Sequence, residues 1–285
     1  MVMDFNQLFP DEREQGETPI RQSQLVMLRM LKILDYICAK HKINYFLSGG
    51  SLLGAVRHKG FIPWDDDLDV GMTRANYERF KKLGAPELPN DIFFQTPETD
   101  PEFPSCHLVE AKLRDKNSSY VLGKGQQGHT WHNGIMLDIF VYDRSFLPHN
   151  FFIYALNRTM MLLYWGKGKN NTGNEKRAKA LRLVSALTPF PLVYASGFIR
   201  NRKMLKLGTN YYKKTEIEAP VRLPFEDMMA CVPQHWDDCL RRQYGDYMKL
   251  PPVDKQRGHF DELPDPFHPC QHTEILYWDK RTVEK

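Results

Sequence analysis

Four aspartates lie close together in one short segment of the chain: Asp65, Asp66, Asp67 and Asp69. In a β-strand, residues two apart project to the same face. Asp67 and Asp69 would therefore direct both carboxylates to one point, while Leu68 faces the core. Two like charges this close repel each other unless a cation lies between them. Mg²⁺ suits such a pair, because it takes oxygen ligands and leaves coordination positions open for substrate phosphates.

A solvated acidic turn is the alternative interpretation of an Asp-x-Asp pair. The apolar residues around this pair, together with the preceding Pro63 and Trp64, argue against a free acidic loop. We expect Asp65 and Asp66 to form the turn and to support the ligands rather than to bind metal themselves.

Asp138 is the candidate for a third metal ligand. It lies within the strongly apolar run of residues 134–142. A carboxylate in an apolar strand is costly unless it is paired or bound to a metal. A salt bridge to a buried arginine such as Arg114 is the alternative for this residue.

The glycine pair Gly49 and Gly50 precedes the aspartates and follows an apolar segment. Glycines let backbone N–H groups approach a phosphate, and the N-terminus of a following helix adds free donors and a positive dipole. Ser51 could cap that helix or bind a phosphate oxygen. A glycine pair alone is usually only a turn, so this interpretation depends on the aspartates that follow.

Hydrophobic periodicity and turn residues predict the elements that position these groups. We expect a helix over residues 19–40, a strand over 43–47, a short helix over 51–57, a strand over 68–72 and a helix over 74–83 capped by Thr73. Further along, we expect a strand over 92–95, a hairpin of residues 106–114 and 118–122, a strand over 135–142, and one or two helices over 225–244. Residues 1–16 have the character of a loose arm.

The bulk composition is that of a globular protein, with 42% hydrophobic and 26% charged residues. We expect no secretory leader and no spanning helix, since no stretch of about 18 uninterrupted apolar residues occurs. The five cysteines are scattered and form no CxxC pair. Free thiols and a cytoplasmic location are the expectation.

Charge is distributed unevenly along the chain. Residues 158–214 carry a net charge of +12, whereas the remainder carries −8. Such a division predicts a face that meets anions, with lipid phosphates, an anionic glycan and nucleic acid as candidates. Within it, residues 183–199 are apolar with basic flanks. They could form a core helix pair or a segment that docks peripherally on an anionic membrane at its inner face.

The segment as a whole resembles the signature of the LicD family. The matching residues are Gly49-Gly50-Ser51-Leu52-Leu53-Gly54-Ala55-Val56-Arg57-His58 and Gly60-Phe61-Ile62-Pro63-Trp64-Asp65-Asp66-Asp67-Leu68-Asp69. They cover about a tenth of the chain. Weaker echoes occur at residues 112–115, 134–140 and 244–252. The C-terminal half matches loosely, so the identity of the acceptor does not carry over.

The LicD family includes bacterial phosphocholine transferases that act on cell-surface glycans, and fukutin-type ribitol-phosphate transferases are related to it. The resemblance implies the nucleotidyltransferase fold of the polymerase-β type. It also implies transfer of a phospho-alcohol from a CDP-linked donor to a sugar hydroxyl, with Mg²⁺ or Mn²⁺. The acceptor would be a glycan of the lipopolysaccharide, teichoic acid or capsule type, and it could be lipid-linked.

Roles for individual residues follow from this chemistry. Asp67, Asp69 and Asp138 would hold one or two divalent ions, and Asp138 could also lower the proton affinity of the attacking hydroxyl. Arg57 suits bidentate contact with a phosphate. Two roles remain open for each of His58 and Trp64. His58 could bind a phosphate or end the helix.

Trp64 could pack under the aspartate turn or contact a choline-like cation through its ring.

The expected class is therefore α+β, a nucleotidyltransferase fold with a mixed sheet flanked by helices and a mostly helical C-terminal half. We expect an N-terminal arm (residues 1–24), a catalytic core (25–145) and a basic helical region completing the acceptor side (146–285). Two alternatives remain. One is a nucleotidyltransferase acting on a small molecule or on nucleic acid, although the Arg-His and Trp-Asp context disfavours nucleic acid. The other is a non-catalytic binding protein.

Overall fold

The computed structural model describes residues 4–101, 103, 109–120, 131–145, 193–195, 211–258 and 263–270. Its helices are α1 (Phe5–Leu8), α2 (Pro19–His41), α3 (Gly49–Arg57), α4 (Arg74–Arg79), α7 (Lys214–Ile217) and α8 (Trp236–Tyr244). Its strands are β1 (Phe46–Leu47), β2 (Asp69–Thr73), β3 (Ile92–Gln95), β4 (Val109–Asp115), β5 (Met136–Ser145), β6 (Val193–Ala195), β7 (Tyr211–Lys213), β8 (Val221–Phe225) and β9 (Met228–Val232).

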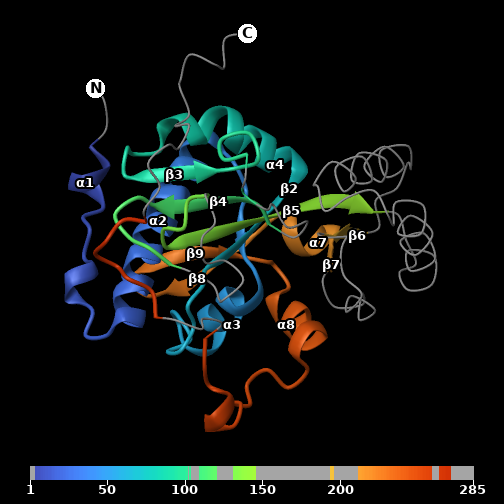
Figure 1. Ribbon diagram of the computed structural model, residues 1–285. Helices are drawn as coiled ribbons and strands as arrows, with labels where there is room; N and C mark the ends of the chain where they lie inside the picture. Colours follow the sequence, from blue (N-terminus) through green and yellow to red (C-terminus); the bar gives the residue numbers. More distant parts are fainter. Residues whose placement is uncertain are drawn as a thin grey trace, which may run out of the picture.

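The main sheet is mixed, with the strand order β1-β2-β5-β4-β3 (Figure 1). Strand β2 runs parallel to β5, whereas the β1–β2, β4–β5 and β3–β4 pairs are antiparallel. Strand β6 pairs with the end of β5, and β7 pairs with β6. Strands β8 and β9 form a separate hairpin. The expected α+β class with a mixed sheet and flanking helices is confirmed.

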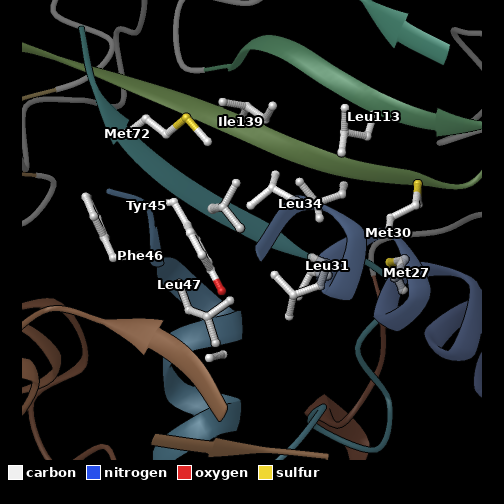
Figure 2. Packing of buried hydrophobic residues seen from close by; sticks show 14 of the residues in the cluster. Met27, Met30, Leu31, Leu34, Tyr45, Phe46, Leu47, Met72, Leu113 and Ile139 are labelled. Carbon is white, nitrogen blue, oxygen red and sulfur yellow. The ribbon is translucent and has the colours of Figure 1, made fainter. Parts of the chain in front are cut away.

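Helix α2 provides one side of the core. Thr18 caps it by accepting a hydrogen bond from the Arg21 amide, and Pro19 occupies the first turn, where its missing N–H is harmless. Its apolar face, which includes the fully buried Leu31 and Leu34, packs against Met72, Ile139 and Leu113 of the sheet (Figure 2).

Side chains alternate between the two faces of a strand, so the residues next to the core residues project from the opposite face of the sheet. Val70 is in register with Ile139, and both point into the core. Their neighbours Asp69 and Asp138 are also in register with each other and therefore project from the opposite face. The core thus orients the candidate site.

Several expected elements are confirmed. The helix over residues 19–40 is α2, the strand over 92–95 is β3, and the apolar run around Asp138 is β5. Thr73 accepts from the Asn76 amide as the N-cap of α4. The helix that follows is α-helical only to Arg79 and continues as a π-helical turn, Phe80–Gly84.

The prediction of a hairpin that turns around residues 115–117 is wrong. A turn is present there, but β4 pairs on one edge with β3 and on the other with β5. Both edges of β4 are therefore filled, and residues 118–120 contribute only an isolated bridge between Ser119 and Asp265. The local turn signal was sound, while the strand partners are set by long-range packing.

The N-terminal arm is anchored rather than loose. Phe5 is buried and its ring contacts Phe9 and Tyr36. The buried Arg13 donates to both carboxylate oxygens of Asp115, at 3.1 and 3.0 Å. A charged residue almost never occurs buried without such a partner, and the sequence alone does not reveal Asp115 as that partner.

The C-terminal half contains more strand than expected where it is described. Residues 225–244 include the hairpin turn and β9 before α8 begins at Trp236. The short apolar run of β9 is compatible with either helix or strand by pattern alone, and its pairing with β8 decides the outcome. The proposed docking segment, residues 183–199, lies outside the described residues except for β6, as does most of the basic stretch.

Two further expectations concern the cysteines and the membrane. Cys38, Cys231, Cys239 and Cys270 are free thiols, while Cys106 lies outside the described residues. Among the helices of the described ranges, none has the length and apolar character needed to cross a membrane.

Candidate active site

A row of charged side chains crosses three neighbouring strands on the face opposite α2. Asp69 of β2 is in register with Asp138 of β5, which is in register with Lys112 of β4. The Lys112 Nζ lies 2.5 Å from Asp138 Oδ1, and both residues are buried. The structure therefore brings together two of the three predicted ligands from distant parts of the chain.

The partner of Asp138 differs from the one considered from the sequence. Arg114 lies on the same strand as Lys112, but it donates to the Gln95 side chain and to the Gly134 carbonyl. It is in register with Met136, two residues before Asp138. Lys112 is thus the cation that compensates this carboxylate.

Burial alternates along the aspartate segment. Asp65, Asp67 and Asp69 are half-buried, whereas Asp66 and Leu68 are buried. The Asp66 carboxylate accepts a hydrogen bond from the Tyr120 hydroxyl. The two residues expected to act together as support therefore differ. Asp66 is held in the interior, while Asp65 has the same exposure pattern as the candidate ligands.

The electrostatics of the row show an excess of negative charge. Burial raises the pKa of Asp69 well above its ordinary value, and the charges of Asp67 and Asp138 raise it further. Lys112 acts in the opposite direction, but does not outweigh the acids. A divalent cation would relieve this repulsion, and the carboxylate oxygens are the donors that Mg²⁺ and Mn²⁺ take.

These residues do not form a closed metal cage. Within the described ranges, no group of three or more His, Cys, Asp or Glu side chains is arranged to hold a metal ion. Mg²⁺ at phosphoryl-transfer sites is usually held by one or two carboxylates together with substrate phosphates. The carboxylate oxygens of Asp69 and Asp138 are ligands of the type that such a partial site uses.

The glycine pair begins α3 directly beside the aspartates. Ser48 is the N-cap residue of this helix, so α3 starts at Gly49 and not at Ser51. Gly49 has a φ of +55°, and a Cβ there would lie 3.1 Å from Asp69 Oδ2. A Cβ on Gly50 would lie 3.0 Å from Asp65 Oδ2. Glycine is thus required at Gly49 both by the left-handed backbone and by the approach of the carboxylate.

Ser51 has a role different from the one expected. It does not cap α3, and its Oγ accepts a hydrogen bond of 2.8 Å from the Asp69 amide. The hydroxyl therefore ties the first turn of α3 to the start of β2. This contact couples the position of the glycine turn to that of Asp69.

Arg57 and His58 interact with each other at the end of α3. The Arg57 Nε donates to His58 Nε2 at 2.9 Å, and another guanidinium nitrogen donates to the Tyr247 carbonyl at 2.9 Å. Burial lowers the pKa of His58, and the charge of Arg57 lowers it further. His58 is therefore the neutral acceptor of this pair. It also ends α3 through its backbone amide, which donates to Gly54.

Trp64 packs against the core and is partly buried. The ring of His58 meets it edge-on, with 6.3 Å between the ring centroids and an angle of 82° between the planes. This placement agrees with a packing role beside the aspartate turn. Contact with a choline-like cation remains a prediction.

Among the residues near the acids that were not singled out from the sequence as site residues are Lys112 and Tyr244, the latter at the end of α8. Partial burial and the charges of Asp69, Asp65 and Asp67 raise the pKa of Tyr244. Both residues lie in the segments that weakly echo the LicD pattern, and that was the available signal.

The chain is similar in sequence to proteins of one known family. The family described as "LicD/FKTN/FKRP, nucleotidyltransferase domain" matches residues 42–170. The chain is 31% identical over 265 residues to "Lipopolysaccharide cholinephosphotransferase LicD" of Haemophilus influenzae, covering 84% of this chain and 95% of that protein. Over 30 residues it is 60% identical to "Ribitol 5-phosphate transferase FKRP" of Mus musculus and of Homo sapiens, or 10% of this chain and 6% of each relative.

The chain therefore belongs to the LicD family, and the resemblance noted in its sequence is confirmed. It is an enzyme, a phosphotransferase of the LicD type.

Proposed function

We propose that this enzyme moves a phospho-alcohol, phosphocholine in the first instance, from a CDP-linked donor to a hydroxyl of a cell-surface glycan. The observation that carries the proposal is the register of Asp69 with Asp138 on parallel strands, beside the glycine turn of α3. The cholinephosphotransferase name of the relative that aligns over most of the chain supports a phospho-alcohol as the group transferred. The ribitol-phosphate relatives support the same class.

Asp67, Asp69 and Asp138 would hold Mg²⁺ or Mn²⁺ in this proposal. The ion would neutralise phosphate charge during displacement of the leaving nucleotide. Phosphoryl transfer depends mainly on positioning and electrostatics. The protein's own part is therefore to hold the donor and acceptor in line and to keep the acids in place.

The residues around the acids have distinct tasks. The backbone amides of Gly49 and Gly50 lie at the N-terminus of α3 and would face the donor phosphates. Arg57 would contact a phosphate while the Tyr247 carbonyl keeps its guanidinium in position. Asp138 would accept the proton of the attacking hydroxyl at a carboxylate oxygen. The Lys112 ammonium, which forms an ion pair with that carboxylate, would hold it in position.

The finer fold assignment is also part of the proposal. A mixed sheet with an acidic pair at the start of one strand and a third acid on its neighbour supports a nucleotidyltransferase fold of the polymerase-β type. We place the enzyme in the cytoplasm, with an acceptor that could be lipid-linked. The basic stretch of residues 158–214 would then serve to bind the acceptor or the membrane.

The test is release of CMP from CDP-choline or CDP-ribitol with Mg²⁺ and an isolated glycan acceptor. Asp67→Asn and Asp69→Asn should each reduce the rate by at least about a hundredfold. Asp4→Asn is the matched control, because the cap of α1 accepts hydrogen bonds with either side chain. Undiminished release in the Asp69 variant would show that the site is misassigned.

A further inference from the structure

The aspartate segment is held from α2 by one buried side chain. The amide nitrogen of Gln24 donates to the Ile62 carbonyl at 3.2 Å and to the Asp65 carbonyl at 3.0 Å. Gln24 is 3% exposed. The two carbonyls flank the turn in which the Asp65 amide donates to Ile62 at 2.9 Å. The Gln24 side chain therefore binds the backbone carbonyls at both ends of the turn that precedes the aspartates.

The same segment is held from the opposite direction by the β8–β9 hairpin. The Glu226 carboxylate accepts from the Phe61 amide at 3.0 Å, and the Glu226 amide donates to the Lys59 carbonyl at 2.7 Å. The ring of Phe225 meets that of Phe61, with 4.9 Å between the centroids. Residues 59–61, immediately before the turn, are thus fixed to an element more than 160 positions further along the chain.

Arg21 joins the two anchors into one network. One guanidinium nitrogen donates to the Gln24 side-chain oxygen at 3.1 Å and to Glu226 Oε1 at 3.2 Å. The other forms an ion pair of 2.6 Å with Glu226 Oε2. A charge-assisted, two-point contact of this kind fixes orientation as well as distance. Gln24 and Glu226 are therefore held relative to each other.

Backbone strain points to a role beyond ordinary packing. Glu226 has a φ of 55° and Lys59, its hydrogen-bond partner, has a φ of 57°. Non-glycine residues enter this region only at a cost that surrounding contacts must offset. Glutamate occupies this position of the hairpin turn, although glycine or asparagine would adopt the positive φ at a lower conformational cost. Of these three residues, only glutamate supplies the carboxylate that accepts from the Phe61 amide and pairs with Arg21.

We propose that Gln24, Arg21 and Glu226 form a positioning clamp for the segment that carries Asp65, Asp67 and Asp69. The clamp fixes the turn before β2, and Ser51 fixes the Asp69 amide after it. The acids then stay in place against their mutual repulsion when no cation is bound. The effect of the clamp on catalysis rests on the proposed function, whereas its effect on the segment does not.

The main test compares two glutamines of α2. Gln24→Met removes both hydrogen bonds to the turn, whereas Gln22→Met removes a bond of the same kind to the Gly16 carbonyl, away from the acids. The first measurement is hydrogen exchange at the Asp69 amide, whose own bond to Ser51 is present in both variants. We expect faster exchange in Gln24→Met and the wild-type rate in Gln22→Met.

The second measurement is steady-state kinetics of CMP release. Misplacement of the acids should lower kcat of Gln24→Met about tenfold to a hundredfold and leave the KM for the donor nearly unchanged. Gln22→Met should retain wild-type values.

A second pair of variants covers the case in which Gln24→Met fails to fold. Glu226→Gly relieves the positive φ but removes the carboxylate, so we expect a folded protein with faster Asp69 exchange and lower kcat. Glu226→Gln retains an acceptor for Phe61 and should lie between this variant and the wild type.

The outcomes separate the clamp from the proposed function. Faster exchange together with lower kcat supports the clamp. Unchanged exchange, or faster exchange with wild-type kcat, overturns it. If the wild-type enzyme releases no CMP from any CDP-linked alcohol, the proposed function fails, and exchange at the Asp69 amide alone then decides whether the clamp holds the segment.

Discussion

Replacement of Lys112 by methionine should have opposite effects on stability and on cation binding. The Lys112–Asp138 pair has side-chain exposures of only 10% and 12%, and its two charged atoms are 2.5 Å apart. Removal of one partner of a buried pair leaves an uncompensated charge and costs about 3 kcal/mol. For a domain of this size, that corresponds to a fall of about 6 to 12 °C in melting temperature without metal.

The affinity for Mn²⁺ should change in the other direction. In the wild-type protein, a cation must compete with the Lys112 ammonium for the Asp138 carboxylate. Lys112→Met removes this competitor, so we expect the Kd for Mn²⁺ to fall about tenfold, or about 1.4 kcal/mol. Binding at a hundred times the Kd contributes about 2.7 kcal/mol. Saturating Mn²⁺ should therefore recover most of the lost stability.

Thermal melts with and without Mn²⁺, together with calorimetric titration of the ion, measure both effects. Lys81→Met is the matched control, because the Lys81–Glu98 pair is more exposed, at 31% and 64%. Its loss should cost less than about 1 kcal/mol and leave the Kd unchanged. Weaker Mn²⁺ binding in Lys112→Met, or a melting temperature equal to that of the wild type, would refute competition at Asp138.

Three further predictions concern the same face of the sheet. Gly49→Ala should lower CMP release at least tenfold with only a modest loss of stability (on the order of 1 kcal/mol), since its Cβ would crowd Asp69 Oδ2 and its φ of +55° disfavours alanine; wild-type turnover would contradict this. Tyr244→Ala should lower kcat/KM for the donor more than Tyr247→Ala does, because the phenol of Tyr244 is the one near the acids; equal effects would argue against contact with substrate. Since the pKa of Asp69 is raised on folding, the native state retains a proton that the unfolded chain loses. Stability without metal should therefore fall as the pH rises above 3.8, the ordinary value, towards the raised pKa, and Mn²⁺ should reduce this slope; urea titrations across that range measure it.

Local patterns in the sequence were enough to predict the orientation of the acids. Alternation along the strand separates Asp69 from Val70, and an apolar run with one carboxylate identifies Asp138. These inferences need only the side-chain period of a strand and the preference of apolar residues for the core. Helix α2 was predictable because its apolar residues recur at helical spacing.

The partner of Asp138 was not predictable in this way. Lys112 and Arg114 are two residues apart on β4, so they share a face. Only the register of β4 against β5, set by packing over long distances, places Lys112 and not Arg114 opposite Asp138. Tyr244 presents the same difficulty, because its position depends on where α8 docks.

The site is assembled from separate parts of the chain because its charges oppose one another. Carboxylates on adjacent strands repel when no cation is bound, and burial strengthens that repulsion. A turn held only by its own residues would relax and move them apart. Instead Lys112 supplies charge from β4, Ser51 holds the Asp69 amide from α3, and Gln24 holds the preceding turn from α2. Cation binding and folding stability should consequently be linked, since the same repulsion opposes folding and favours the ion.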